Sequence, residues 1–228
     1  MQTLESEIID CWEKNVTPWT KVIREGAIPS RVNVTNAAIL DAISRFQPRS
    51  VLDIGCGEGW LCRELRHRGV ETLGVDAVPE LIAQAQQFGA GAGDFAVCHY
   101  QDLHNGLARL KRERFELAVC NFSLLGEYSV EAVFQAIPEL LVPDGVFLVQ
   151  TLHPVVASGG QGYQDGWRTG SWQGFGPEFK DPAPWYFRTL SSWFDLFRRH
   201  HLEVTRLIEP TDESGQIMSV IICAELSA

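Results

Sequence analysis

The chain has 228 residues, of which 45% are hydrophobic and 21% charged, so it can bury a core without help from disulfides or metal ions. Its formal net charge of −10 repels a phosphate backbone, and no stripe of Lys and Arg offsets that charge, which argues against a nucleic-acid partner. No apolar run approaches the roughly 20 residues that span a bilayer, and residues 1–14 lack the basic start of a signal peptide, so we expect a cytoplasmic protein with no membrane partner.

The cysteines and histidines show no ligand or redox spacing. The six cysteines include no CxxC pair, and the six histidines include no HExxH pattern. We therefore expect free thiols in a reducing compartment and no structural or catalytic metal.

Helical spacing of apolar residues precedes the first strand-like segment. Residues 1–16 follow this spacing, and Pro18 is expected to interrupt it; residues 34–46 follow it again, up to Pro48. We expect residues 1–48 to form an N-terminal helical cap on the rest of a single domain that spans residues 1–228.

Short apolar runs then alternate with helical patterns, which is typical of βαβ units and a parallel sheet buried on both faces. Helices are expected at 59–67, 79–88, about 104–111 and 129–141. Strands are expected at 50–55, 71–76, 95–100, 115–122 and 145–152.

The segment after residue 154 differs in composition. It is rich in glycine and shows no sustained periodicity. A loop this long inside a compact domain is usually functional or disordered, and its aromatic content argues against disorder. We expect residues 155–187 to form a substrate lid, with a small auxiliary core as the alternative. Its aromatic residues include Tyr163, Trp167, Trp172, Phe175 and Phe179.

Residues 188–228 return to regular patterns. A helix is expected at 190–200, a strand at 203–208, a turn at 212–215 and a strand at 218–225. The two strands are expected to pair antiparallel at one edge of the sheet.

The segment VLDIGCGEGW at residues 51–60 is the strongest signal in the chain. A buried strand leads into Gly55, Gly57 and Gly59, whose missing Cβ atoms let the backbone turn and approach a ligand. Asp53 stands just before the turn, and the position of Cys56 requires a small side chain. A carboxylate there repels a pyrophosphate and attracts an ammonium or a sulfonium. The spacing GxGxG also differs from the GxGxxG of dinucleotide sites.

Three later strand ends carry further polar residues. Asp76 stands 21 residues after Gly55, about the spacing at which an acid meets ribose hydroxyls. Val78 can pack against an adenine ring, and Asp102 can reach its amine while Leu103 covers a ring face. The fourth strand ends in Asn121 and Phe122, at the same edge of the sheet.

These residues resemble the class I S-adenosylmethionine-dependent methyltransferases, over about residues 50 to 152 and including LLVPDGVFLVQT at 140–151. The resemblance implies a Rossmann-like α/β fold, with a seven-stranded, mostly parallel sheet, helices on both faces and an antiparallel last strand. Residues 49–154 would be the cofactor-binding core. By this resemblance, Asp53, Gly55 and Gly57 would hold the methionine end, Asp76 the ribose, and Asp102 with Leu103 the adenine, while the main-chain groups of Asn121 and Phe122 would approach the sulfonium. Further residues expected to bind the cofactor are Cys56, Ala77, Val78 and Gln101.

One segment argues against a class of acceptor, and two residues leave alternatives open. The sequence NFSL at 121–124 lacks the prolines and tyrosine of amino-directed family members, which argues against adenine- and glutamine-directed activity. His153 follows the fifth strand and is either a general base or a structural histidine. Arg31 is either a partner of the methionine carboxylate or a surface residue.

The sequence therefore predicts an enzyme that transfers a methyl group from S-adenosyl-L-methionine to an O, N or C atom of a small molecule by in-line displacement, leaving S-adenosyl-L-homocysteine. Three alternatives are a nicotinamide-dependent oxidoreductase, a non-catalytic S-adenosylmethionine-binding module and a protein-directed methyltransferase. Association into a homodimer is left open.

Overall fold

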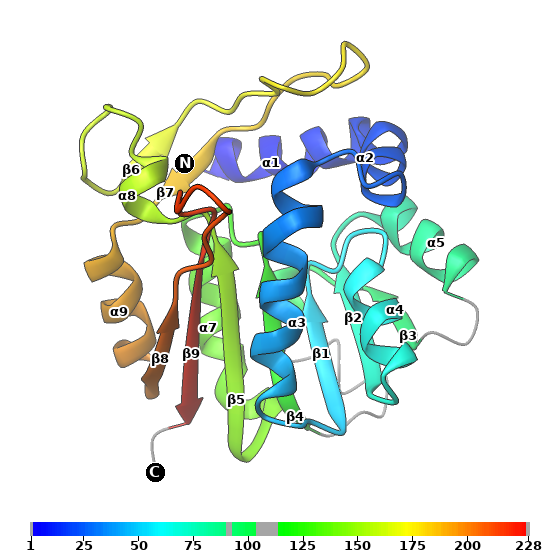
Figure 1. Ribbon diagram of the computed structural model, residues 1–228, viewed down its shortest axis with the longest axis vertical. Coiled ribbons are helices and arrows are strands. Elements are labelled where there is room, and N and C mark those ends of the chain that lie inside the picture. Colours follow the sequence, from blue (N-terminus) through cyan, green and yellow to red (C-terminus); the bar gives the residue numbers. More distant parts are fainter. Residues whose placement is uncertain (1, 90–92, 104–113, 227–228) are drawn as a thin grey trace.

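The computed structural model describes residues 2–89, 93–103 and 114–226, and it places a seven-stranded sheet at the centre of the chain (Figure 1). The helix expected at about 104–111 lies outside the described residues. The sheet order is β3-β2-β1-β4-β5-β9-β8. Its strands are β1 (Ser50–Ile54), β2 (Glu71–Asp76), β3 (Asp94–Val97), β4 (Phe115–Asn121), β5 (Leu141–Thr151), β8 (Leu202–Ile208) and β9 (Val220–Leu226).

Strand β9 alone reverses direction in this sheet. The pairs β1/β2, β2/β3, β1/β4 and β4/β5 are parallel, whereas β9 is antiparallel to both β5 and β8. The predicted fold class and the antiparallel edge pair are thus confirmed.

The order of the strands creates the place for a ligand. Strand β1 pairs with β2 on one side and β4 on the other, so the chain crosses to opposite sides of β1 in its two halves. Ligands of such sheets bind in the crevice at the carboxyl ends of the strands where this switch occurs. Asp53, near the end of β1, lies opposite Gly74 and Val119 in register.

Helices cover both faces of the sheet because alternate residues of its strands are apolar on each side. On one face, α3 (Asn36–Ser44) and α4 (Trp60–His67) pack against a cluster that includes Val51 and Leu117. On the other, α7 (Tyr128–Leu140) and α9 (Leu190–Arg199) pack against Leu52 and Phe147. Helix α5 (Pro79–Phe88) follows β2, and the short helix η2 (Tyr100–Asp102) follows β3.

The N-terminal helices lie across the carboxyl end of the sheet (Figure 1). They are α1 (Gln2–Lys14) and α2 (Val16–Arg24), followed by the π-helical turn η1 (Arg31–Thr35). The expected break at Pro18 is wrong. The chain bends at Asn15, and Pro18 lies in the first turn of α2, where its missing N–H has no helical partner to lose.

The aromatic segment runs over α1 and returns to the sheet (Figure 1). It contains α8 (Pro154–Ala157) and a two-stranded antiparallel sheet of β6 (Gly166–Arg168) and β7 (Trp185–Phe187), which the sequence analysis did not anticipate. Its rings pack on the N-terminal helices, since Trp172 lies 5.9 Å from Trp12 and Phe175 lies 6.4 Å from Trp19, measured between ring centroids.

Three further properties of the chain concern its thiols, metals and membranes. All six cysteines are buried and free, as expected. Within the described residues, no group of three or more His, Cys, Asp and Glu side chains is placed to hold a metal ion. In the same part of the chain, no helix is long and apolar enough to cross a membrane.

Asn15 joins α1 to the aromatic segment. The residue is 0% exposed. Its Nδ2 donates to the carbonyls of Cys11 at 2.7 Å and Lys180 at 2.8 Å, and its Oδ1 accepts from the Lys180 N–H at 2.9 Å. A buried amide with three main-chain partners fixes the position of residue 180 on α1.

We expect Asn15→Ala to lower the free energy of unfolding by about 1–3 kcal/mol, because it leaves buried backbone groups without partners. Urea unfolding measures this change, and proteolysis within residues 158–180 should quicken. Lys14→Ala is the matched control, since Lys14 pairs with Asp181 at the exposed surface and its loss should change stability less. Equal stability of the two variants would contradict the role of Asn15.

Candidate functional site

A cavity of about 370 Å³ opens at the carboxyl ends of β1, β2 and β4, under α1 and α2. Helix α1 contributes Ile8, Ile9 and Trp12 to its roof. The structure brings most of the predicted cofactor residues together on its wall, namely Arg31, Asp53, Gly55, Cys56, Gly57, Asp76, Ala77, Val78, Gln101, Asn121 and Phe122.

The glycine loop after β1 needs its glycines for two different reasons. Gly55 has φ 76° and its backbone N–H donates to the Val75 carbonyl at 2.8 Å; a Cβ there would overlap the side chain of Ser123. Gly57 has φ 57°, and a Cβ there would meet only Trp19 Nε1, at 3.8 Å. Gly55 therefore permits close packing, while Gly57 leaves open space on the side of the cavity.

Asp76 fastens this loop to the end of β2. Its Oδ2 accepts from the Gly57 N–H at 2.9 Å, and its Oδ1 accepts from the Val78 N–H at 3.0 Å. Burial raises the pKa of this carboxyl, and the backbone N–H groups of Val78 and Gly57 oppose the rise. Each oxygen keeps acceptor capacity for one hydroxyl, as binding of a ribose requires.

Asp53 is a buried acid without a cation beside it. The residue is 2% exposed, and its nearest polar side-chain partner is the Cys62 thiol, 3.5 Å from Oδ2. Burial raises the pKa of Asp53 to about 7. The hydrogen bond from Cys62 and the attraction by Arg31 lower this pKa, whereas repulsion by Asp76 raises it further. No ion pair to Asp53 is present within the described part of the chain. A bound ammonium group would complete this environment.

Arg31 lies between two indole rings at the mouth of the cavity. The guanidinium carbon is 5.8 Å from the Trp19 ring centroid and 5.3 Å from that of Trp60. Burial lowers the pKa of Arg31 to about 10, and attraction by Glu58 and Asp53 opposes the shift. Its Nε donates to Asn36 Oδ1 at 3.4 Å. A cation held by aromatic faces keeps donors free for a carboxylate.

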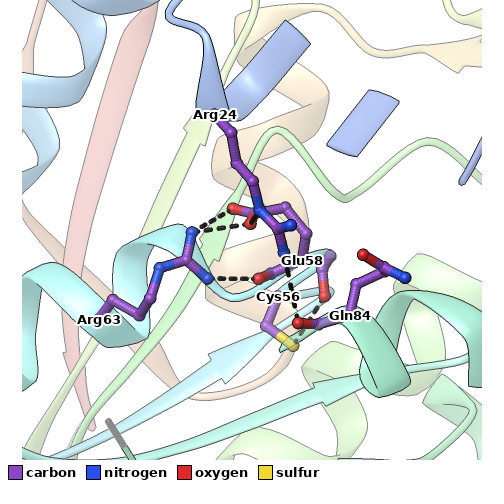
Figure 2. Close-up of polar contacts among 6 residues, drawn as sticks. Arg24, Cys56, Glu58, Arg63 and Gln84 are labelled. Atoms are coloured by element: carbon purple, nitrogen blue, oxygen red, sulfur yellow. Dashed lines mark hydrogen bonds and ion pairs between the residues drawn. The ribbon is translucent and has the colours of Figure 1, made fainter. Parts of the chain in front are cut away.

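Glu58 is a part of the site that the sequence analysis missed, and Figure 2 shows its surroundings. It is buried in the glycine loop, where Arg63 Nη2 contacts both carboxylate oxygens at 2.8 and 2.7 Å and Arg24 Nε donates to Oε2 at 3.1 Å. Arg24 lies on α2 and Arg63 on α4, so this acid ties the N-terminal cap to the loop. The spacing of five residues between Glu58 and Arg63 was the local sequence feature that could have indicated their ion pair.

Glu5 provides a second tie, between α1 and the start of α7. Its Oε1 accepts from the backbone N–H groups of Glu127 at 2.6 Å and Tyr128 at 2.8 Å, and its Oε2 accepts from that of Ser129 at 3.2 Å. Carboxylates are stabilised at helix N-termini by these free donors and by the helix dipole. A contact across more than 120 residues of sequence leaves no local signal to find.

Three predicted residues lie outside this cavity. Asp102 is exposed at the end of η2, and Leu103 is fully buried in the hydrophobic core. His153 is 4% exposed; its Nε2 lies 2.8 Å from Glu209 Oε1, and its Nδ1 accepts from the Val155 N–H at 3.3 Å. Both ring nitrogens thus have partners within the chain, and the general-base role of His153 gains no support from its position.

A second cavity of about 340 Å³ adjoins the first, and Trp12, Trp19, Arg31, Phe122 and Leu125 line both. Phe122 has φ 55°, a left-handed conformation that a bulky residue rarely adopts and that is found at functional sites. The remaining aromatic wall comes from Trp172, Phe175, Trp185, Tyr186, Phe187 and Trp193.

Two features of the first cavity fit S-adenosylmethionine. Among the described residues, Asp53 forms no ion pair, and Asn121 presents a buried Oδ1 that has no hydrogen-bond partner. Both groups can accept from a ligand with an ammonium group, and the open side of Gly57 leaves room for it.

The sheet order, the glycine loop and the two acids define the class I methyltransferase fold. A family model described as a methyltransferase domain matches residues 30–207. The chain belongs to this family, and the predicted resemblance is confirmed.

The chain is also similar to particular relatives. It is 31% identical over 130 residues to the ubiquinone biosynthesis O-methyltransferase of Xylella fastidiosa strain 9a5c, covering 56% of this chain and 52% of that protein. The chain spans about half the length of the curated relatives it matches first. In the corresponding protein of Actinobacillus pleuropneumoniae the identity is 24%, and 67% of each chain is covered.

Solved structures share the fold. A 1,6-didemethyltoxoflavin-N1-methyltransferase of Burkholderia thailandensis, with its substrate and S-adenosylhomocysteine bound, matches with a TM-score of 0.62 and 18% identity, over 94% of this chain and 88% of that one. An S-adenosylmethionine-dependent methyltransferase of Listeria monocytogenes, itself described as putative, matches with a TM-score of 0.65 and 18% identity, over 85% and 100% of the two chains.

The affinity for S-adenosylhomocysteine should depend on pH through Asp53. The carboxyl must be ionised to hold an ammonium, so affinity is present above its pKa of about 7 and is lost as the pH falls through that value. Between about pH 8 and pH 6 the ionised fraction falls about tenfold, and calorimetry should show a similar fall in affinity.

Two variants separate this effect from other titrations. Asp53→Asn should bind weakly with a flat pH profile, whereas Asp41→Asn, at an exposed acid on α3, should keep the slope of the parent protein. A slope that persists in Asp53→Asn would assign the effect to another group.

Proposed function

We propose that the chain is an S-adenosyl-L-methionine-dependent methyltransferase that methylates a small molecule. The observation that carries this proposal is the buried, unpaired Asp53 beside the glycine loop. A pyrophosphate at that point would meet a carboxylate, while an amino-acid ammonium would meet its counter-ion.

In this proposal each part of the first cavity holds one part of the cofactor. Asp53 binds the ammonium, Arg31 binds the methionine carboxylate from between its two indoles, and Asp76 binds the ribose hydroxyls. Gln101 lines the first cavity, and in this proposal it contacts the adenine in place of Asp102 and Leu103, which lie outside that cavity. When bound, the cofactor supplies a methyl group already activated by its sulfonium.

The second cavity provides the place for the acceptor. Because Phe122 and Leu125 line both cavities, a molecule in the second can approach the first without crossing solvent. Orientation of two reactants can contribute up to roughly 7–11 kcal/mol to a displacement, and the aromatic walls exclude water from it. Aromatic faces also stabilise the positive charge that is spread in the transition state.

The acceptor atom is an oxygen or a nitrogen in this proposal. The relatives in Xylella fastidiosa and Burkholderia thailandensis are described as an O-methyltransferase and an N1-methyltransferase. A small molecule is favoured over a protein side chain because aromatic residues of this segment line the second cavity. A homodimer stays a prediction.

Calorimetric titration tests the cofactor assignment. The protein should bind S-adenosylhomocysteine and not NAD. Asp76→Ala should lower the affinity for S-adenosylhomocysteine by about ten- to a hundredfold, the range of a lost charged hydrogen bond. Asp41→Asn should leave the affinity for S-adenosylhomocysteine unchanged. Binding of NAD in preference would overturn the proposal. A tight cofactor complex that forms no product with a broad panel of hydroxylated and aminated acceptors would make the chain a binding module.

Deletion of residues 158–180 tests the role of the aromatic segment. None of these residues lines the first cavity, whereas Trp172 and Phe175 line the second. The shortened protein should therefore keep its affinity for S-adenosylhomocysteine within a few-fold and lose turnover. A turnover equal to that of the full chain would show that the segment is no substrate lid.

A further inference from the structure

The second cavity contains a buried arginine that has no acidic partner. Arg188 follows β7, is 8% exposed, and lines the cavity. Its guanidinium carbon lies 4.7 Å from the ring centroid of Tyr186 and 5.2 Å from that of Trp193. Burial lowers the pKa of this group, and Tyr186, Asp165, Glu127 and Glu131 oppose the shift by attraction.

The hydrogen bonds of Arg188 leave donors unused. Nη1 donates to the Gly126 carbonyl at 2.8 Å, and Nη2 donates to the Glu127 carbonyl at 2.9 Å. A guanidinium has five N–H donors. Among the residues that the structure describes, no carboxylate forms an ion pair with Arg188. The other donors therefore remain for a ligand.

Two other arginines, whose side chains are partly exposed, show what Arg188 lacks. Arg63 and Arg24 both contact the carboxylate of Glu58, so each of them has an acidic partner within the fold. A buried charge is ordinarily paired because its desolvation is costly. In a chain with a net charge of −10, Arg188 still forms no ion pair with any carboxylate that the structure describes.

The surroundings of Arg188 are also joined to the wall between the two cavities. Tyr186 N donates to the Leu125 carbonyl at 2.7 Å, and Arg188 holds the next two carbonyls, those of Gly126 and Glu127. Leu125 lines both cavities and Gly126 lines the first. An anion bound at Arg188 would thus lie against the segment that borders the cofactor site.

We propose that the methyl acceptor is a planar aromatic molecule with a carboxylate, and that Arg188 binds this carboxylate while the ring lies among the aromatic side chains of the second cavity. The inference rests on the proposed function and specifies its substrate class. One arginine matches a group with a single negative charge, and the planar guanidinium fork matches the two oxygens of a carboxylate. The volume of about 340 Å³ suits a molecule of one to three rings.

The test compares a carboxylate with its neutral amide. Calorimetry on the full chain, with and without saturating S-adenosylhomocysteine, measures the binding of 2-naphthoate and 2-naphthamide. The parent protein should bind the acid at least about tenfold more tightly than the amide, and Arg188→Gln should lose this preference. Arg188→Lys should keep a part of it, because it retains the charge without the fork.

Arg168→Gln is the matched control. Arg168 lies on β6, in the same small sheet, and stacks on Phe187, but it lines neither cavity. The variant should keep the preference for the acid. A purely structural Arg188 would change stability and leave the ratio of acid to amide affinity unchanged, so that ratio is the deciding quantity. If Arg188→Gln does not fold, the ratio of acid to amide affinity is compared between the parent protein and Arg188→Lys.

The outcomes separate this inference from the proposed function. Binding of S-adenosylhomocysteine without a preference for the acid, or without binding of either naphthyl compound, would overturn the inference alone. A preference that depends on Arg188 in a protein that does not bind S-adenosylhomocysteine would sustain the anion site and overturn the methyltransferase proposal.

Discussion

The buried carboxyl of Asp53 is the constraint around which the rest of the site is arranged. It lies near the end of the central strand β1, between β2 and β4, and is 2% exposed. Asp76 raises the pKa of Asp53 further, and Arg31, which lies between the Trp19 and Trp60 rings, lowers it by attraction without forming a direct ion pair. A fold that tolerates such an unbalanced group does so at a cost in stability, and a cationic ligand removes that cost. The same group thus explains both the strain in the free site and its selectivity.

Further carboxylates hold the roof over this site. Glu5 binds the N-terminus of α7 from α1, and Glu58 binds Arg24 of α2 from within the glycine loop. The roof is therefore tied at two ends to the elements that line the first cavity. Asn15 then fixes the aromatic segment to α1, so the wall of the second cavity rests on the roof of the first. Any movement of α1 would therefore disturb both cavities.

The sequence was sufficient for the features that depend on local pattern. Alternating apolar runs gave the sheet, and the glycine loop with Asp53 and Asp76 gave the centre of the site, because each is encoded within about 25 residues. The contacts of Glu5 and Asn15 were out of reach because their partners lie more than 100 residues away. His153 shows the converse limit: its position after β5 is the one expected for a ligand contact, but its side chain turns to Glu209. Backbone topology fixes where a residue stands, and packing decides where its side chain points.

The charges of the two cavities differ from those of the chain as a whole. With a net charge of −10, the surface repels anions at long range, yet Arg31 and Arg188 are both cations that line cavities and lack an ion-pair partner in the described residues. Screening limits the surface field to about 8 Å at physiological ionic strength, whereas a hydrogen-bonded contact in a desolvated cavity acts at about 3 Å and is much stronger. An anionic acceptor would therefore be slowed on approach and held firmly once inside. For the acceptor class proposed above, this arrangement favours discrimination among similar aromatic molecules over rapid capture.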